Sequence, residues 1–260
     1  MRENKVKRAL QRGETVIGTM ITEARSPAIV QILAAAGLDF IFIDMEHGPY
    51  SLETVSDLIR VARLAGICPL VRVPDPLYHL MAQPLDAGAQ GLMIPRVETV
   101  EQVEHIISST KYRCERGCST FRSHSDFQKV PVRDFMDWAD AETMIILQIE
   151  RERAIANIEA LLSVPEVDAA LIGPNDLSIS LGLPGQVNHP IVIESIEKVI
   201  EACRKLGLAC GIHIGDMGAL KGWMRKGMRL ITYSSEANFI YEAALAAVKE
   251  LRAEAEAIGR

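Results

Sequence analysis

Two carboxylates and an imidazole follow the apolar run FIFI in the stretch FIDMEHGPY, residues 42–50. They belong to Asp44, Glu46 and His47. A carboxylate beside a histidine can hold the ring for acid–base chemistry. The pairing of His47 with Asp44 therefore predicts proton transfer here, and the alternative is a plain surface histidine. Glu46 occupies the middle of the turn, and we expect it to point away and form a salt bridge.

A second polar group follows two later apolar runs, as QIE at 148–150 and GPND at 173–176. If the two runs are adjacent strands, the carboxylates of Glu150 and Asp176 converge, which suits a hard divalent cation. Gln148 lies two residues before Glu150 and points to the same face. The alternative is that both carboxylates cap the helices that follow them.

Arg72, in LVRVP, is the positive charge of its apolar run. Its planar guanidinium can hold a substrate carboxylate through two hydrogen bonds. A salt bridge to Asp44 or Glu46 is the alternative, and the two roles are compatible. His213 is expected to be a satisfied histidine of the protein interior, and Ser234 and Ser235 give only a weak phosphate-site signal.

Short apolar runs with the character of buried parallel strands position these groups. The predicted strands are 15–22, 39–44, 70–73, 91–95, 144–150, 168–173, 208–214 and 229–235. Eight strand–helix units in a chain of this length predict a (β/α)8 TIM barrel, whose site lies at the carboxyl ends of the strands. A doubly wound open sheet is the alternative, but no G-x-G-x-x-G motif follows the first strand.

Amphipathic helical patterns separate the strands, and the clearest are 26–36, 51–65, 99–109, 151–163, 190–206 and 236–258. In three places a glycine closes a helix just before a strand, as left-handed caps commonly do. The sequence therefore predicts one barrel domain over residues 1–260. It carries an inserted polar loop at about 111–129 and a C-terminal helix at about 236–258.

The composition argues against several partners. The net charge is −6, no basic stripe is present and no apolar run is long enough to span a membrane, so we expect neither nucleic acid nor membrane as a partner. The charged start MRENKVKRAL lacks the apolar segment of a secretory signal. Five scattered cysteines complete no zinc site. These features predict a cytoplasmic protein with free thiols.

None of the eight predicted strands contains a lysine, and Lys221 and Lys226 lie in the helical pattern after the seventh strand. An enzyme that forms a Schiff base inside the barrel needs such a lysine. This pattern disfavours imine chemistry and favours metal chemistry.

With these features in view, the chain resembles the metal-dependent, class II pyruvate aldolases that include 4-hydroxy-2-oxoheptanedioate aldolase and 2-dehydro-3-deoxyglucarate aldolase. The likeness runs from about residue 13 to 240 and rests on FIDMEHGP, LVRVP, DAGAQGLMIPRVET, QIE and LIGPNDLSISLG. It implies a phosphoenolpyruvate/pyruvate-type barrel that reversibly cleaves a 4-hydroxy-2-oxo acid to pyruvate and an aldehyde through a metal-stabilised enolate.

The resemblance also assigns roles to residues. Mg²⁺, Mn²⁺ or Co²⁺ would bind the residues matching Glu150 and Asp176. Arg72 matches the residue that holds the keto oxygen, and Gln148 matches one that lines the metal and pyruvate site. Backbone N–H groups of Gly173, Asn175 and Asp176 would bind the substrate carboxylate. His47 and Asp44 match the acid–base dyad.

Two further expectations come from the family. Its members commonly form hexamers of paired subunits that exchange the last helix, so we expect a homo-oligomer. In relatives, the loop matching 111–129 helps to choose the aldehyde and begins with a proline pair. Here it reads KYRCERGCSTFRS, with Arg and Cys in place of the prolines.

Two other functions remain open at this point. One is a lyase for acyl-CoA thioesters, since a related barrel family shares the carboxylate pair. The sequence shows no obvious basic patch for the phosphates of CoA, to which Arg122 and Arg133 could contribute. The other is a catalytically inactive barrel that senses a keto acid. That reading predicts loss of the metal pair or of the His–Asp dyad, and both are present.

Overall fold

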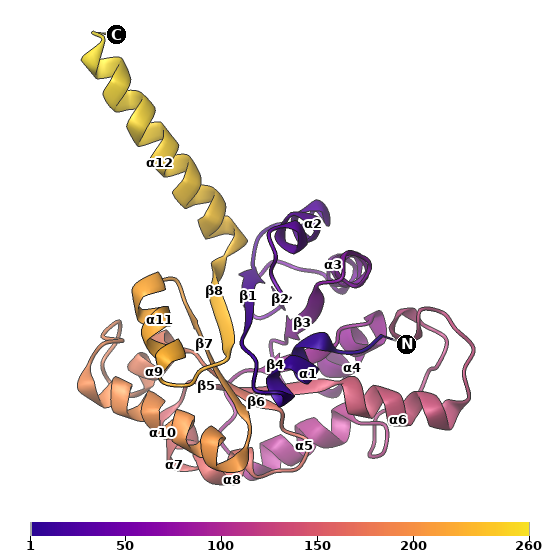
Figure 1. The fold of residues 1–260 in the computed structure, drawn as a ribbon. Helices are drawn as coiled ribbons and strands as arrows, with labels where there is room; N and C mark the ends of the chain where they lie inside the picture. Colours follow the sequence, from indigo (N-terminus) through magenta and orange to yellow (C-terminus); the bar gives the residue numbers. More distant parts are fainter. Residues whose placement is uncertain (1, 260) are drawn as a thin grey trace.

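The computed structural model describes residues 2–259, in which eight parallel strands close into a barrel in sequence order (Figure 1). The strands are β1 (Val16–Ile21), β2 (Phe40–Asp44), β3 (Cys68–Arg72), β4 (Gly91–Ile94), β5 (Met144–Ile149), β6 (Ala169–Ile172), β7 (Ala209–Ile214) and β8 (Leu230–Ser235). The predicted (β/α)8 barrel is confirmed, and each predicted strand overlaps an observed one.

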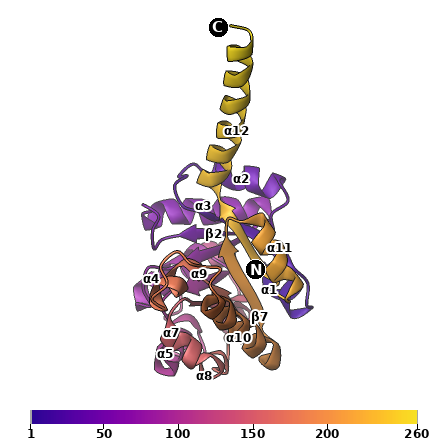
Figure 2. The same cartoon turned by 90° about the vertical axis from the view of Figure 1, so that its left-hand side faces the viewer.

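Helices surround the barrel (Figures 1 and 2). They are α1 (Lys5–Gln11), α2 (Ala28–Ala35), α3 (Leu52–Ala65), α4 (Tyr78–Ala87), α5 (Val100–Thr110), α6 (Val132–Glu142), α7 (Glu152–Ala156), α8 (Ile158–Leu162), α9 (Pro174–Ser180), α10 (Pro190–Leu206), α11 (Met217–Arg225) and α12 (Glu236–Ala257). The helix expected over 151–163 is two short ones that meet at Asn157. The three predicted glycine caps, Gly37, Gly88 and Gly227, all have positive φ.

Two apolar layers hold the barrel. One lies between the strands and the helices, and the other fills the barrel interior with residues such as Phe40, Phe42, Leu70 and Ile146. The side chains of Val6 and Leu10 in α1 join the interior layer. Helix α1 therefore closes the amino-terminal end of the barrel, and the carboxyl end is left for a site.

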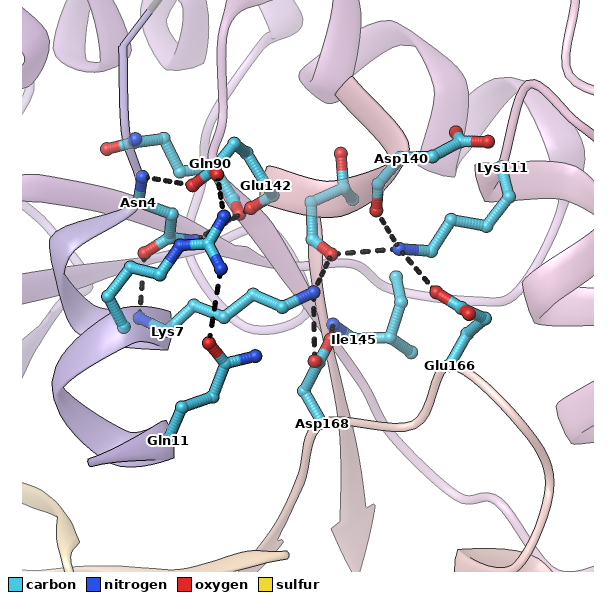
Figure 3. Close-up of polar contacts among 12 residues, drawn as sticks. Asn4, Lys7, Gln11, Gln90, Lys111, Asp140, Glu142, Ile145, Glu166 and Asp168 are labelled. Carbon is cyan, nitrogen blue, oxygen red and sulfur yellow. Dashed lines mark hydrogen bonds and ion pairs between the residues drawn. The ribbon is translucent and has the colours of Figure 1, made fainter. Parts of the chain in front are cut away.

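Hydrogen bonds fasten α1 at the amino-terminal end (Figure 3). The side-chain amide of Asn4 donates to the carbonyl oxygens of Gln90, at 2.8 Å, and Glu142, at 3.0 Å. The backbone N–H of Asn4 donates to the Glu142 carboxylate at 2.7 Å. Its side chain also caps α1 by accepting from Lys7 N–H. One asparagine thus joins the first helix to the residues before β4 and β5.

The ammonium groups of two buried lysines, one of them in α1, lie close together (Figure 3). Both ammonium groups donate to the carbonyl oxygen of Thr143, Lys7 at 3.1 Å and Lys111 at 2.9 Å. Lys7 pairs with Asp168 at 2.9 Å, and Lys111 pairs with Glu166 at 3.5 Å. Burial, reinforced by the charge of Lys7, lowers the pKa of Lys111 to about 8. Each buried ammonium nevertheless has several oxygen partners.

Helix α12 leaves the end of β8 and projects away from the barrel (Figures 1 and 2). Its side chains are almost all exposed, including Ile240, Tyr241, Leu245, Val248 and Leu251. A hydrogen-bonded carboxylate fixes its first residue, since Glu236 accepts from the backbone N–H groups of Thr22, Glu23 and Ala24. Over residues 2–259, no helix combines the length and apolar character needed to cross a membrane.

Candidate active site

An ion pair joins the ends of β2 and β3. These strands align Asp44 with Arg72, and the carboxylate of Asp44, 1% exposed, accepts two hydrogen bonds from the guanidinium, at 2.8 Å from Nε and 2.6 Å from Nη2. Burial alone would lower the pKa of Arg72, but Asp44, with Glu46 and Glu150, holds it above its ordinary value. The predicted salt bridge of Arg72 is confirmed, and its outer Nη1 also contacts Glu46 at 3.3 Å.

The turn after β2 is organised by its backbone. Asp44 Oδ1 accepts from the N–H groups of Glu46, at 3.0 Å, and His47, at 3.3 Å. A Cβ at Gly48 would lie 2.3 Å from the Asp44 carbonyl oxygen, so the tight turn requires glycine there. Asp44 therefore holds the turn and Arg72 at the same time.

His47 does not pair with Asp44 through its ring. Its side chain is 68% exposed, and its Nε2 lies 3.9 Å from Glu46 Oε2. The expectation that Glu46 points away is wrong, because its side chain is nearly buried between Arg72 and Arg96, although the expected salt bridge is present. Both Asp44 oxygens are already engaged by Arg72, so Asp44 places the His47 backbone and Glu46 stands nearest its ring.

A second buried carboxylate lies at the end of β5. Glu150 accepts from Gln148 Nε2 and, at 2.9 Å, from the backbone N–H of Arg96. Arg96 adopts a left-handed conformation, φ 55°, which is uncommon for a residue with a Cβ. Burial raises the pKa of Glu150, and the charges of Asp176 and Glu46 add to the rise. The charges of Asp176 and Glu46 therefore disfavour the ionised form of Glu150.

Sequence reasoning missed Arg96. The signal for it is its position, since Arg96 follows β4 after one proline in IPRV. Its side chain contacts Glu46 at 3.4 Å while its N–H holds Glu150. Arg96 therefore links the Asp44–Arg72 pair to the β5 carboxylate.

The segment after β6 opens helix α9. Gly173 precedes it without a side-chain cap, Pro174 begins it, and Asp176 lies in its first turn. A Cβ at Gly173 would lie 3.1 Å from Glu150 Oε2, so glycine allows this close approach. The N–H of Gly173 donates to the Ile149 carbonyl at 3.3 Å. The first-turn N–H groups of Asn175 and Asp176 are therefore the ones free for a ligand.

Helix capping does not explain the carboxylates. The N-cap of α7 is Arg151 and that of α9 is Gly173, and neither helix has a side-chain cap. Glu150 precedes the N-cap of α7, and Asp176 lies inside α9. The alternative role considered for these two residues is therefore not observed.

A small cavity of about 60 Å³ lies among these groups at the carboxyl end of the barrel. It is lined by Met20, Arg72, Met93, Gln148, Leu171, Gly173, Pro174, Asn175, Asp176 and His213. Five of the predicted site residues thus share one cavity. His213 lies inside the barrel as expected, but it is not fully satisfied, because its Nδ1 is buried without a hydrogen-bond partner among residues 2–259.

The donor set can be tested for a divalent cation. Among the described residues, no three His, Cys, Asp or Glu side chains form a metal cluster, so a cation would depend on two carboxylates, substrate and water. Gln148 Oε1 is buried beside Glu150 without a partner. A hard cation would give this oxygen a partner and would stabilise the ionised form of the neighbouring Glu150 carboxylate, whose pKa is raised. The residues fit such an ion.

The buried lysines do not alter this chemistry. Lys7 and Lys111 contact Thr143, which precedes β5, and therefore lie at the amino-terminal end of the barrel. The cavity lies at the other end, and its lining includes no lysine. This arrangement agrees with the expectation from the sequence that imine chemistry is disfavoured.

Comparison with known proteins gives consistent matches. The model of the HpcH/HpaI aldolase/citrate lyase family matches residues 19–243. A hydroxypyruvate/pyruvate aldolase of Roseobacter denitrificans is 33% identical, over 90% of this chain and 91% of the relative. A 2-keto-3-deoxy-L-rhamnonate aldolase of Klebsiella pneumoniae is 34% identical, over 82% and 80%. The crystal structure of an HpcH/HpaI aldolase from Desulfitobacterium hafniense superposes with a TM-score of 0.90 at 33% identity, covering 95% of this chain and 96% of that one.

Proposed function

This chain belongs to the HpcH/HpaI aldolase/citrate lyase family, and from that premise we propose that it is a lyase that reversibly cleaves a 4-hydroxy-2-oxo acid to pyruvate and an aldehyde. The observation that carries the proposal is the cavity in which Arg72, Gln148 and Asp176 meet at the carboxyl end of the barrel. It combines a fixed positive charge, free backbone donors and the carboxylate of Asp176, and Gln148 in its wall contacts the second carboxylate, Glu150.

Different groups of the protein bind different parts of the 2-oxo acid. Arg72, held rigid by Asp44, faces the keto oxygen and stabilises the negative charge that develops there during carbon–carbon cleavage. The first-turn N–H groups of Asn175 and Asp176 bind the carboxylate. Glu150 and Asp176 would hold a divalent ion, Mg²⁺, Mn²⁺ or Co²⁺, with Gln148 beside it. When bound, that ion supplies Lewis-acid stabilisation of the same charge.

His47 moves the proton at the C4 hydroxyl. In the cleavage direction its imidazole takes the hydroxyl proton as the C3–C4 bond breaks, the electron pair of that bond passes into the enolate, and the enolate then takes a proton at C3 to become pyruvate. In the synthetic direction the imidazole returns its proton to the new oxygen on C4. Its exposed ring follows the carboxyl end of β2, the end of the barrel from which we expect the aldehyde half of the substrate to enter. Glu46 lies nearest the ring, and Asp44 sets the turn through the His47 N–H. Proton transfer by a positioned side chain is the ordinary role of such an imidazole.

A pyruvate-release assay tests this function. Protein treated with a chelator is offered a panel of 4-hydroxy-2-oxo acids, before and after addition of Mg²⁺, Mn²⁺ or Co²⁺. We expect release of pyruvate only with a restored ion. We also expect no adduct when borohydride is added with pyruvate, since the cavity lacks a lysine. Full activity after verified ion removal, or a trapped adduct, would contradict the proposal.

We also propose a homo-oligomer, commonly a hexamer in this family, in which α12 packs against another subunit. The support is its exposed apolar side chains, Ile240, Tyr241, Leu245, Val248 and Leu251, on a helix that projects from the barrel (Figure 1). A cytoplasmic location stays a prediction, supported by five free cysteines. Light scattering of the full chain beside a variant that ends at residue 238 tests the assembly.

A further inference from the structure

The ring of His47 has little to hold it in place. Its side chain is 68% exposed, and its one ion-pair contact within residues 2–259 is Glu46 Oε2, at 3.9 Å. The position of the ring therefore depends on the backbone of its turn. Asp44 holds that backbone through the N–H groups of Glu46 and His47. Any further support for the ring must also act on the backbone of the turn.

The aromatic ring of Tyr50 gives such support. A Cβ built at Gly48 would lie 2.8 Å from Tyr50 Cε2 and 2.9 Å from Cδ2, so the edge of the ring lies directly against the Gly48 backbone. Gly48 is the residue that follows His47. Tyr50 is only partly buried, and it packs against the apolar layer between strands and helices. The turn of His47 is therefore held by the Tyr50 ring as well as by Asp44.

The hydroxyl of Tyr50 fixes this ring to a second loop. It donates to the carbonyl oxygen of Ala24 at 3.2 Å, in the segment between β1 and α2. Burial raises the pKa of Tyr50, and the charges of Glu236, Glu23 and Asp44 add to the rise. The hydroxyl therefore keeps its proton at neutral pH and remains a donor. Tyr50 thus joins the turn after β2 to the segment after β1.

The segment after β1 is held by the first residue of α12. The carboxylate of Glu236, 1% exposed, accepts from the N–H groups of Thr22 at 2.9 Å, Glu23 at 2.7 Å and Ala24 at 2.8 Å. Hydrogen bonds to an ionised carboxylate are stronger than those between neutral groups. A continuous line of contacts therefore runs from the start of α12, through residues 22–24 and Tyr50, to the turn of His47.

Resting on the proposed function, we propose that Tyr50 and Glu236 are positioning residues, which hold the turn of His47 where its imidazole reaches the C4 hydroxyl. Neither side chain belongs to the lining of the cavity, so both act through the turn. Misplacing a reacting group by about 1 Å can cost about 10²-fold in rate. The 2-oxo acid half of the substrate binds elsewhere, at Arg72 and the first turn of α9. Loss of either residue should therefore lower kcat and spare KM.

Tyr50→Phe gives the mildest test, because it keeps the ring against Gly48 and removes only the bond to Ala24. The kcat for cleavage of a 4-hydroxy-2-oxo acid should fall about 3- to 10-fold, as expected for one lost hydrogen bond. KM and the Mn²⁺ affinity should equal those of the wild type. Tyr233→Phe is the matched control. It removes the hydroxyl of a tyrosine that stacks on Phe239, at 5.6 Å between ring centroids, and should leave kcat unchanged.

Double variants show whether the effect passes through His47. Once the imidazole is absent in His47→Ala, adding Tyr50→Phe should change kcat by less than about two-fold, because residues that act as a unit are not additive. Glu236→Gln, which withdraws the negative charge from residues 22–24, should lower kcat about 10-fold. Combined with Tyr50→Phe, it should lower kcat by less than the product of the two separate effects. Glu236→Asp keeps the charge on a shorter side chain and replaces Glu236→Gln if that variant does not fold.

The outcomes separate the two proposals. A wild-type protein without lyase activity contradicts the proposed function and this inference together. An active enzyme whose kcat is the same in Tyr50→Phe overturns only the positioning role. That role is also overturned if Tyr50→Phe keeps its full effect on the His47→Ala background, or if it weakens Mn²⁺ binding. Either result would show that Tyr50 supports the fold or the metal site rather than the imidazole.

Discussion

The buried lysines at the amino-terminal end of the barrel and the buried polar groups around the cavity at its carboxyl end differ in how their polar atoms are partnered. At the amino-terminal end, Lys7 and Lys111 are held by carbonyl oxygens and by the carboxylates of Asp168 and Glu166 (Figure 3). At the carboxyl end, Glu150 faces other carboxylates, and Gln148, His213 and Thr232 each keep an unpartnered polar atom.

From this difference we infer that the lysine network is structural and that the cluster at the carboxyl end is functional. Buried polar groups that satisfy one another stabilise a single arrangement of the chain. Groups that remain unsatisfied carry a cost in stability, which is recovered when a ligand binds. Removing a charge should therefore harm catalysis at one end and stability at the other.

Of the variants that test this comparison, Glu150→Gln should have the largest effect on catalysis. Losing the carboxylate should lower turnover by about 10³-fold or more, because a bound cation supplies several kcal/mol of charge stabilisation. Without metal, the variant should unfold at a higher urea concentration than the wild type, since the neutral amide ends the repulsion from Asp176 and Glu46. Assays over a Mn²⁺ series and urea titrations measure both. A variant that is active and less stable would place Glu150 in a structural network.

His47→Ala separates proton transfer from binding at the same end. Turnover should fall about 10²-fold, the lower part of the range for general acid–base catalysis, because water and buffer reach this exposed ring. Metal binding should stay intact. Asp44→Asn is the comparison variant and should be at least as harmful, because Asp44 fixes Arg72 as well as the turn. If His47→Ala abolished Mn²⁺ binding, His47 would be a ligand.

Asp168→Asn makes the matching change at the amino-terminal end. It leaves the buried ammonium of Lys7 without its nearest carboxylate, so the free energy of unfolding should fall by about 3 kcal/mol, as for other broken buried pairs. The kcat of the folded variant should equal that of the wild type. Asp137→Asn, at an exposed pair with Arg133, is the control and should change neither quantity. Equal stability of Asp168→Asn and wild type would show that the lysine network contributes little.

The smallest effect concerns the pH dependence of stability. The pKa of Lys111 is about 8 in the folded protein and 10.5 ordinarily, so between these values the unfolded chain binds more protons and stability rises with pH. Wild type measured against Lys111→Met should therefore gain about 2 kcal/mol from pH 8 to 10. Taking the difference cancels the titration of other groups. Urea titrations at four pH values check this, and a flat difference would refute it.

The sequence by itself determined the barrel and the positions of most of its chemistry. Runs of apolar residues and the glycines before strands are local signals, because each reflects the environment and backbone of a few neighbouring residues. Once eight strands were recognised, Asp44, Arg72, Glu150 and Asp176 had to meet at the carboxyl end. The division into one domain stays a prediction.

Only the tertiary structure decided which of those groups touch. Asp44 binds Arg72 rather than the ring of His47, because strand register places the two side by side. The orphaned atoms of His213 and Thr232, and the meeting of Lys7 with Lys111, depend on segments far apart in the chain. No local pattern encodes such contacts, since they arise when the barrel closes and fixes the distance and direction of each side chain.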